Sequence, residues 1–511
     1  MSANLSAAAA LGLLASFAIE RLLQPRPRPV WKQGAGSAAL HSGLWLVGFS
    51  LLTPIVGRPW FAMAVLLALL LLLVMVNNAK WRSLREPFVF QDYDYFVDAL
   101  RHPRLYIPFL GWGRAIAAAL GGAAAIALGL WAEERLALAF SNVAGLVGMF
   151  LAGAGLIAWG HRRLPPMDYR PEREVIRHGF LPLLWVYGMA HRRPPGETPA
   201  QFPESVTETG ERELPNLVAV QSESFFDPRA LWPGIRPGVF EGLDRLGGEA
   251  VAAGPLEVPA WGANTVRSEF AFLTGIPESA LGVHRFNPYR AIGSQYRPAT
   301  IASYLKQLGY RTVCVHPYPA SFYDRARVYP LMGFDEFIDI GAFSDDDYFG
   351  PYVSDEAVAE KVRELVGGES RPLFVFVITM ENHGPLHLES VNAGDREALY
   401  ETAPPAGCED LTVYLRHLNN ANQMAKLMAE TLEQQHRPAW MCWYGDHVPI
   451  MPEVYDRLGT PEGRTRYFLW GSDTKGRGPV EGGAVHALAE QLLGHAGLLD
   501  PVGSSTSKIT R

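Results

Sequence analysis

The first third of the 511-residue chain consists of long apolar runs separated by basic connections. Most of the runs approach the roughly 20 residues that a helix needs to cross a hydrocarbon core about 30 Å thick. The run from Phe61 to Val76 is almost entirely Ala, Leu, Val and Met. A helix of this composition is apolar on every side, whereas a helix on the surface of a soluble protein is apolar on one face only. The pattern predicts five membrane-spanning helices: Leu5 to Ile19, Ala38 to Val56, Trp60 to Val76, Ala115 to Trp131, and Ala137 to Trp159. No small-residue cleavage site follows the first run, so it is expected to be an uncleaved anchor.

Lysine and arginine gather after the first, third and fifth runs, in residues 21–32, 80–104 and 161–177. Because basic connections favour the cytoplasmic side, five spans would leave the rest of the chain in the cytoplasm. The short apolar segment Phe180 to Met189 could add a re-entrant or sixth segment and reverse this assignment. The charge pattern alone therefore leaves the side open.

Residues 192–215 are rich in Pro, Thr and Glu and lack apolar periodicity, which predicts a linker. After it, short apolar runs typical of buried strands alternate with stretches of helical spacing. The predicted strands are Leu217 to Val220, Thr312 to Val315, Leu373 to Ile378 and Trp440 to Tyr444, and the predicted helices are Thr300 to Leu308, Ser354 to Val366 and Leu411 to Gln434. This alternation predicts an α/β domain with a mostly parallel sheet covered on both faces.

The predicted organisation is an all-α transmembrane bundle over residues 1–165, a juxtamembrane segment and linker over 166–213, the α/β domain over 214–498, and a disordered tail over 499–511. A net charge of -7 provides no positive field, which excludes nucleic acid as a partner. Cys314, Cys408 and Cys442 form no CxxC pair, so they are expected to be small core residues.

Polar residues follow three of the predicted strands, at the ends where α/β sheets bind ligands. Glu223 follows the first strand in QSESFFD, and His383 follows the third in ITMENHGP. Asp446 and His447 follow the fourth in WYGDHVP, where an adjacent acid and imidazole suit a divalent ion. The alternative for each residue is a helix cap, a salt bridge or a surface histidine.

Thr265 stands before a predicted helix in PAWGANTVRSEFAFLTGIP. On one interpretation it only caps that helix. On the other, the helix N-terminus binds an anionic phosphate, and a nearby metal ion activates the hydroxyl as a nucleophile.

A third group follows the second strand in VHPYPASFYDRARVYPLMGFDEF. Arg325 can bind phosphate through two parallel hydrogen bonds, and Tyr323 offers an aromatic ring against which a headgroup can pack. His316 lies nearby in sequence. The alternative is a structural network of Arg325 with Asp324 and Asp335.

Taken in order, SES, GANTVRSEF, HPYPASFYDR, ENHGP and YGDH resemble the motifs of the lipoteichoic acid synthase and phosphoglycerol transferase branch of the alkaline phosphatase and sulfatase superfamily. The resemblance covers about residues 214–490. It implies a bacterial inner-membrane protein with a sulfatase-like catalytic domain on the extracytoplasmic, periplasmic side. The segment NNAKWRSLREPFVFQDYDYF resembles the family's juxtamembrane loop on that side, which outweighs the charge pattern.

The resemblance implies that Glu223, Thr265, Asp446 and His447 bind one divalent ion, Mn²⁺ or Mg²⁺, with Zn²⁺ as the alternative. Thr265 would also be the nucleophile. The residues that match headgroup-binding positions are His316, Arg325 and His383, together with Tyr323 where relatives often carry tryptophan.

The implied reaction begins when Thr265 attacks the phosphodiester of phosphatidylglycerol, which releases diacylglycerol. A glycan or polyglycerol-phosphate acceptor then takes the glycerol-phosphate group, and His383 or His316 moves the proton. The open alternatives are a phosphoethanolamine transferase, a phosphodiesterase, a sulfuric ester hydrolase and a non-catalytic membrane scaffold. A sulfatase is disfavoured because no CxPxR-like motif surrounds Thr265.

Overall fold

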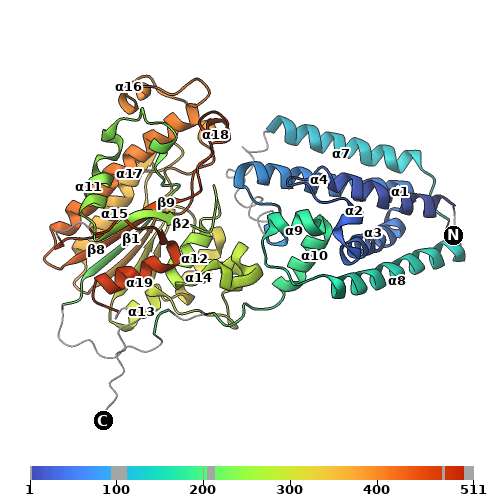
Figure 1. The fold of residues 1–511 in the computed structure, drawn as a ribbon, viewed down its shortest axis with the longest axis horizontal. Helices are drawn as coiled ribbons and strands as arrows, with labels where there is room; N and C mark the ends of the chain where they lie inside the picture. The colour runs from blue at the N-terminus through green and yellow to red at the C-terminus, as the bar shows by residue number, and fades with distance from the viewer. Residues whose placement is uncertain are drawn as a thin grey trace, which may run out of the picture. The chain divides into compact units, whose positions relative to one another are not determined.

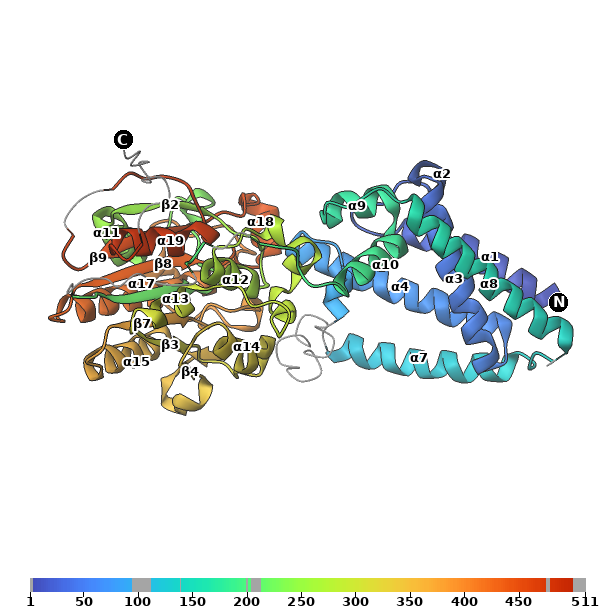
Figure 2. The same cartoon turned by 90° about the horizontal axis from the view of Figure 1, so that it is seen from below.

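The computed structural model describes residues 3–93, 112–137, 139–198, 201–203, 213–474 and 478–499. The chain divides into two compact units, Met1–Arg193 and Pro194–Arg511 (Figures 1 and 2). The predicted disordered tail, apart from residue 499, and part of the predicted linker lie outside the described residues.

The first unit is built from apolar helices. Four of them are long and apolar enough to cross a membrane, which confirms four of the five predicted spans: α1 (Ala3–Glu20), α3 (Ala35–Val56), α4 (Pro59–Leu84) and α8 (Phe140–Arg163). The remaining predicted span forms α7 (Trp112–Ala132). Its apolar part, Leu120–Ala132, is shorter than a spanning helix. The segment after the last span forms α9 (Pro171–His178) and α10 (Phe180–His191), and α10 is shorter than a spanning helix.

Helices α3 and α8 approach each other closely at glycines. A Cβ atom on Gly43 would lie 2.6 Å from the carbonyl oxygen of Gly153, and one on Gly160 would lie 2.7 Å from that of Gly36. In lipid, where burial of apolar surface does not drive helix association, such small residues let two backbones pack by van der Waals contact.

The second unit contains an eight-stranded sheet in the order β10-β2-β9-β8-β1-β7-β3-β4. The four predicted strands are confirmed and pair in parallel at its centre: β1 (Asn216–Ser222), β3 (Arg311–Val315), β7 (Leu373–Ile378) and β8 (Ala439–Gly445). Strand β9 (Thr465–Gly471) is antiparallel to both β8 and β2 (Ala252–Glu257). The edge strands are β4 (Glu336–Ile338) and β10 (Gly483–Ala484).

Strand β1 packs against helices on both faces of this sheet (Figure 1). Val218 and Val220 join one core, with α11 (Glu241–Glu249), α15 (Asp355–Gly368) and α17 (Glu409–Glu433). Leu217 and Ala219 join the opposite core, with α12 (Val266–Thr274), α13 (Ile301–Gln307) and α19 (Val485–His495). Burial on both faces explains why the strand sequence is continuously apolar, and the three predicted helices are confirmed as α13, α15 and α17.

The register of the central strands brings their carboxyl ends to one edge. Ser222 pairs with Gly445, and Gln221 pairs with Ile378. Gly445 is required here because a Cβ atom at this position would lie 2.0 Å from the carbonyl oxygen of Phe225. The loops that follow β1, β7 and β8 therefore begin side by side.

Candidate active site

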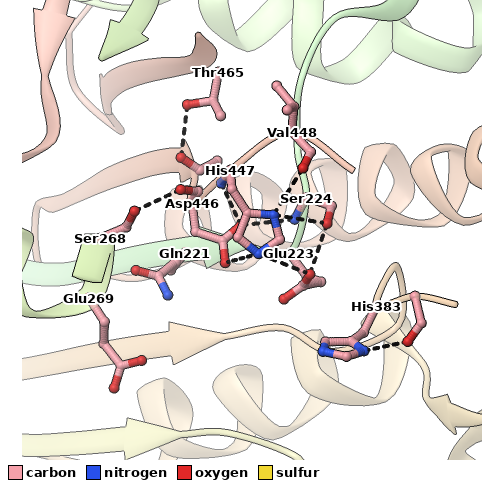
Figure 3. Close-up of polar contacts among 12 residues, drawn as sticks. Gln221, Glu223, Ser224, Ser268, Glu269, His383, Asp446, His447, Val448 and Thr465 are labelled. Carbon is pink, nitrogen blue, oxygen red and sulfur yellow. Dashed lines mark hydrogen bonds and ion pairs between the residues drawn. The ribbon is translucent and has the colours of Figure 1, made fainter. Parts of the chain in front are cut away.

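Glu223, Asp446 and His447 meet at this edge of the sheet (Figure 3). Each offers one ligand atom, and these atoms all lie within 4.8 Å of one another. All three residues are buried. The structure thus brings together three of the four predicted metal ligands.

Hydrogen bonds orient these three side chains. Asp446 Oδ1 accepts the backbone N–H groups of Ser224 and His447, both at 2.9 Å, whereas its buried Oδ2 accepts no hydrogen bond from the described residues. His447 Nδ1 donates to the carbonyl oxygen of Val448 at 3.2 Å. This assigns the proton to Nδ1 and leaves Nε2 facing Glu223 Oε1 at 3.6 Å and Asp446 Oδ2 at 3.4 Å. Two carboxylate oxygens and an unprotonated imidazole nitrogen form a donor set that fits a divalent ion.

The carboxylates repel each other in this buried setting. Burial, followed by the charge of Asp446, raises the pKa of Glu223 to about 8. A positive ion between the two carboxylates would remove this repulsion.

Metal affinity is therefore expected to depend steeply on pH. Glu223 must lose its proton to bind an ion, so the apparent affinity for Mn²⁺ should fall by about tenfold for each pH unit below the raised pKa. In the metal-free protein the folded state holds a proton that the unfolded state releases above pH 4.5. The free energy of unfolding should therefore decrease as the pH rises from 4.5 to about 8.

Calorimetric titration with Mn²⁺ at several pH values, in buffers of different ionisation enthalpy, measures both the affinity and the protons released. Affinity that is independent of pH, with no proton release, would contradict this assignment of Glu223.

Thr265 lies at the N-terminus of α12 but does not cap it. Its backbone is already helical, with φ -38° and ψ -39°, and within the described segment its side chain makes no capping hydrogen bond. Asn264, with φ 68°, adopts the left-handed conformation that a non-glycine residue rarely takes. One turn further, Ser268 Oγ donates to the carbonyl oxygen of Asp446 at 2.7 Å, which fixes this end of α12 to the loop that carries Asp446 and His447. Thr265 as fourth ligand and nucleophile stays a prediction.

Arg325 has a different partner from those considered in the sequence. Its Nε and Nη2 donate to the two oxygens of Glu269 at 2.9 and 2.8 Å, and both residues are buried. The two acids near it in sequence have other partners: Asp324 pairs with Arg327, and Asp335 pairs with Lys306.

Glu269 also accepts hydrogen bonds from Tyr289 and Tyr329, at 2.6 and 2.5 Å. Burial alone would raise the pKa of Glu269, but Arg325 and the two hydroxyls hold it below the ordinary value. The ion pair joins α12, which Thr265 precedes, to α14 (Arg325–Leu331).

The two candidate histidines differ in how many of their ring nitrogens are already hydrogen-bonded. His316 donates from Nδ1 to the carbonyl oxygen of Ile378 at 3.0 Å and accepts from Arg325 Nη1 at Nε2, 3.3 Å away. Burial, followed by the charge of Arg325, lowers the pKa of His316 to about 3. His383 donates from Nδ1 to the carbonyl oxygen of Gly384 at 2.6 Å, and no described residue bonds to its Nε2 (Figure 3). His383 is therefore the better-placed proton carrier.

Sequence reasoning missed Glu381, which anchors the loop that carries His383. Its Oε2 accepts the backbone N–H of Asp355 at 2.7 Å, while its Oε1 accepts from His417 at 2.9 Å and from Asn420 at 2.6 Å. Its position in ENHGP, shortly after an apolar strand, could have indicated that Glu381 belongs to the site. Its partners on α17 could not be foreseen because they lie more than 30 positions away.

Residues 215–498 match the family model of the sulfatases, and this match covers more than half of the chain. The chain belongs to the sulfatase family. The superfamily that the motifs resemble is thereby confirmed, while the particular branch stays a prediction.

This sulfatase-family chain also resembles individual proteins. It is 28% identical over 437 residues to the capsular polysaccharide biosynthesis protein RkpI of Rhizobium meliloti, over 81% of this chain and 77% of that protein. It is 27% identical over 263 residues to a protein of the same organism described provisionally as a cyclic beta-1,2-glucan modification protein, over 50% of this chain and 39% of that protein.

Among solved structures, the integral membrane lipooligosaccharide phosphoethanolamine transferase A (EptA) of Neisseria meningitidis has a TM-score of 0.57 at 14% identity, over 96% of this chain and 95% of that chain. At this identity the likeness shows the fold alone. The four helices that are long and apolar enough to cross a membrane identify this sulfatase-family chain as a multi-pass membrane protein.

Proposed function

We propose that this protein is a membrane-anchored phosphotransferase that moves glycerol phosphate from phosphatidylglycerol to a glycan of the cell envelope. The observation that carries the proposal is the hydroxyl of Thr265, which leaves the N-terminus of α12 uncapped beside the loop of Asp446. A helix N-terminus stabilises a phosphate, and a hydroxyl without a capping bond can act as a nucleophile. The names of the two Rhizobium meliloti relatives support a glycan acceptor.

In the first half of the reaction, Thr265 Oγ1 attacks phosphorus and the P–O bond to diacylglycerol breaks. The threonine proton ends on the departing diacylglycerol oxygen. In the second half, an acceptor hydroxyl attacks the same phosphorus, the bond to Thr265 breaks, and the acceptor's proton ends on Thr265 Oγ1. His383 Nε2 carries the proton in both halves, because Nδ1 is already bonded to Gly384.

Glu223, Asp446 and His447 would hold one divalent ion, which when bound neutralises phosphate charge and lowers the pKa of a hydroxyl. Thr265 would be the fourth ligand. One imidazole nitrogen among oxygens suits Mn²⁺ or Zn²⁺ better than Mg²⁺.

Arg325 favours a glycerol headgroup over ethanolamine. Its guanidinium carbon lies 5.1 Å from the centre of the Tyr323 ring. A second cation, such as the ammonium group of ethanolamine, would have to compete with Arg325 for this ring. A neutral glycerol group does not meet this obstacle.

Incubation of the full-length protein with Mn²⁺ and vesicles of either phosphatidylglycerol or phosphatidylethanolamine tests this function. Mass spectrometry of the peptide containing Thr265 should find a glycerophosphoryl adduct only with phosphatidylglycerol. An adduct only with phosphatidylethanolamine would overturn the donor. In a second incubation that also contains β-1,2-glucan oligosaccharides, release of glycerol phosphate without transfer to the glucan would identify a phosphodiesterase. A protein that neither binds Mn²⁺ nor turns over either lipid would be a scaffold.

A further inference from the structure

Three exposed apolar side chains lie close together on the described part of the catalytic unit. They are Tyr348, Phe349 and Leu388, whereas Val480, the other large apolar residue exposed on this part, pairs with Ala253 of β2. Tyr348 and Phe349 form strand β5 (Tyr348–Phe349) of a small hairpin with β6 (Tyr352–Val353), and Leu388 ends a short helix, η9 (Leu386–Leu388). An exposed cluster of this kind marks a binding surface.

The hairpin is joined to the loop that carries His383. Tyr352 Oη donates to the carbonyl oxygen of Gly384 at 3.2 Å and lies 3.2 Å from His383 Nδ1. The ring of Phe349 meets the ring of His417 edge to face, with centroids 5.6 Å apart. A Cβ atom on Gly350, in the turn, would lie 3.0 Å from Glu389 Oε2, directly after Leu388. Phe349 pairs with Tyr352 across the hairpin, so its ring lies on the same face as the tyrosine that contacts His383.

The charge next to these rings is negative. Asp345 and Asp346 are exposed in the short helix η8 (Asp345–Asp347) that leads into β5. Two exposed carboxylates repel an anionic lipid surface, and they equally repel a polyanion such as polyglycerol phosphate. Carboxylate oxygens accept hydrogen bonds from hydroxyl groups, and aromatic faces cover the apolar C–H faces of sugar rings.

We infer that the β5–β6 hairpin is the acceptor subsite, where a neutral carbohydrate chain stacks on Phe349, on the hairpin face that it shares with Tyr352, passes around the strand to Tyr348 on the opposite face, and presents a hydroxyl near His383. This inference rests on the proposed transferase function and selects between the two acceptors that the sequence left open. The carboxylates of Asp345 and Asp346 hydrogen-bond the sugar hydroxyls.

The test compares wild type with the double variant Tyr348→Ala/Phe349→Ala in the full-length protein. The donor half-reaction is followed by diacylglycerol release from phosphatidylglycerol vesicles. The acceptor half-reaction is followed by transfer to β-1,2-glucan oligosaccharides. In the variant, the donor half-reaction should stay within about twofold of wild type, while KM for the glucan rises about tenfold, the effect of losing about 1.4 kcal/mol of stacking. Val480→Ala, an exposed apolar residue of the same unit, should change neither value.

Saturation-transfer NMR of β-1,2-glucan with each protein gives a readout that does not require turnover. Signal transfer to the glucan from wild type but not from the double variant supports the subsite. Absence of an adduct on Thr265 would reject the proposed function only, and the subsite would still stand on the NMR result. An unchanged KM with unchanged NMR signals, an equal loss in both half-reactions, or preferential transfer to polyglycerol phosphate would each overturn the inference. Thermal unfolding of the variant, in which the contact between Phe349 and His417 is lost, checks that the protein stays folded under the assay conditions.

Discussion

Replacement of Thr265 by alanine should abolish transfer, with a loss on the order of 10⁴-fold or more in kcat, while the protein stays folded. The expected loss is large because the nearest other hydroxyl on α12, that of Ser268, is already bonded to the carbonyl oxygen of Asp446. Stability should hardly change, since the hydroxyl makes no capping bond whose loss would weaken the helix. Mass spectrometry after incubation with phosphatidylglycerol should find no adduct in this variant, and Thr265→Ser should restore part of the activity.

Thr300 provides a matched control, because it is also a threonine at a helix N-terminus. Its Oγ1 accepts the backbone N–H of Ser303 at 2.9 Å, and its backbone is extended as in a true cap. Thr300→Ala should cost about 1 kcal/mol of stability and leave transfer unchanged. If Thr265→Ala behaves like Thr300→Ala in both measurements, Thr265 is a structural residue and the covalent mechanism is wrong.

Replacement of Asp446 by asparagine should remove metal binding without unfolding the site. The remaining side-chain oxygen can still accept the N–H groups of Ser224 and His447, whereas an amide NH₂ takes the place of the unpartnered Oδ2. Affinity for Mn²⁺ should fall by at least about 100-fold, and transfer activity should fall with it.

The same substitution should stabilise the metal-free protein at neutral pH. Removing the charge of Asp446 lowers the pKa of Glu223, so ionisation of this buried carboxyl costs less in the folded state. Thermal unfolding with and without a chelator measures both effects: chelation should destabilise wild type but not the variant. Asp244→Asn, a substitution at a more exposed aspartate of the same unit, should leave metal binding intact. A variant that binds Mn²⁺ like wild type would show that the ion is held elsewhere.

Much of the fold follows from local sequence patterns. Strand β7 has the bounds that its apolar run predicts, because burial on both faces demands a continuous run such as Leu373–Ile378. Strand β2 was missed because only two of its six residues are buried and it contains glycine and proline, which give no strand signal. The antiparallel strand β9 was missed as well.

The candidate site was only partly predictable. Glu223, Asp446 and His447 follow apolar strands, so their place at the carboxyl edge could be inferred from the chain alone. The partner of Arg325 could not be inferred, because Glu269 precedes it by 56 positions and no local pattern links the two residues.

The sequence by itself determined the membrane helices, the parallel core of the sheet and the strand-end position of the three candidate ligands, because each depends on a run of apolar residues and the polar residue that ends it. Only the tertiary structure decided that Thr265 leaves its helix uncapped, that His316 is occupied by Arg325 while His383 keeps a free nitrogen, and that an aromatic hairpin lies beside that histidine. These features depend on contacts between segments far apart in the chain, and no local pattern specifies which of the available partners a polar side chain meets.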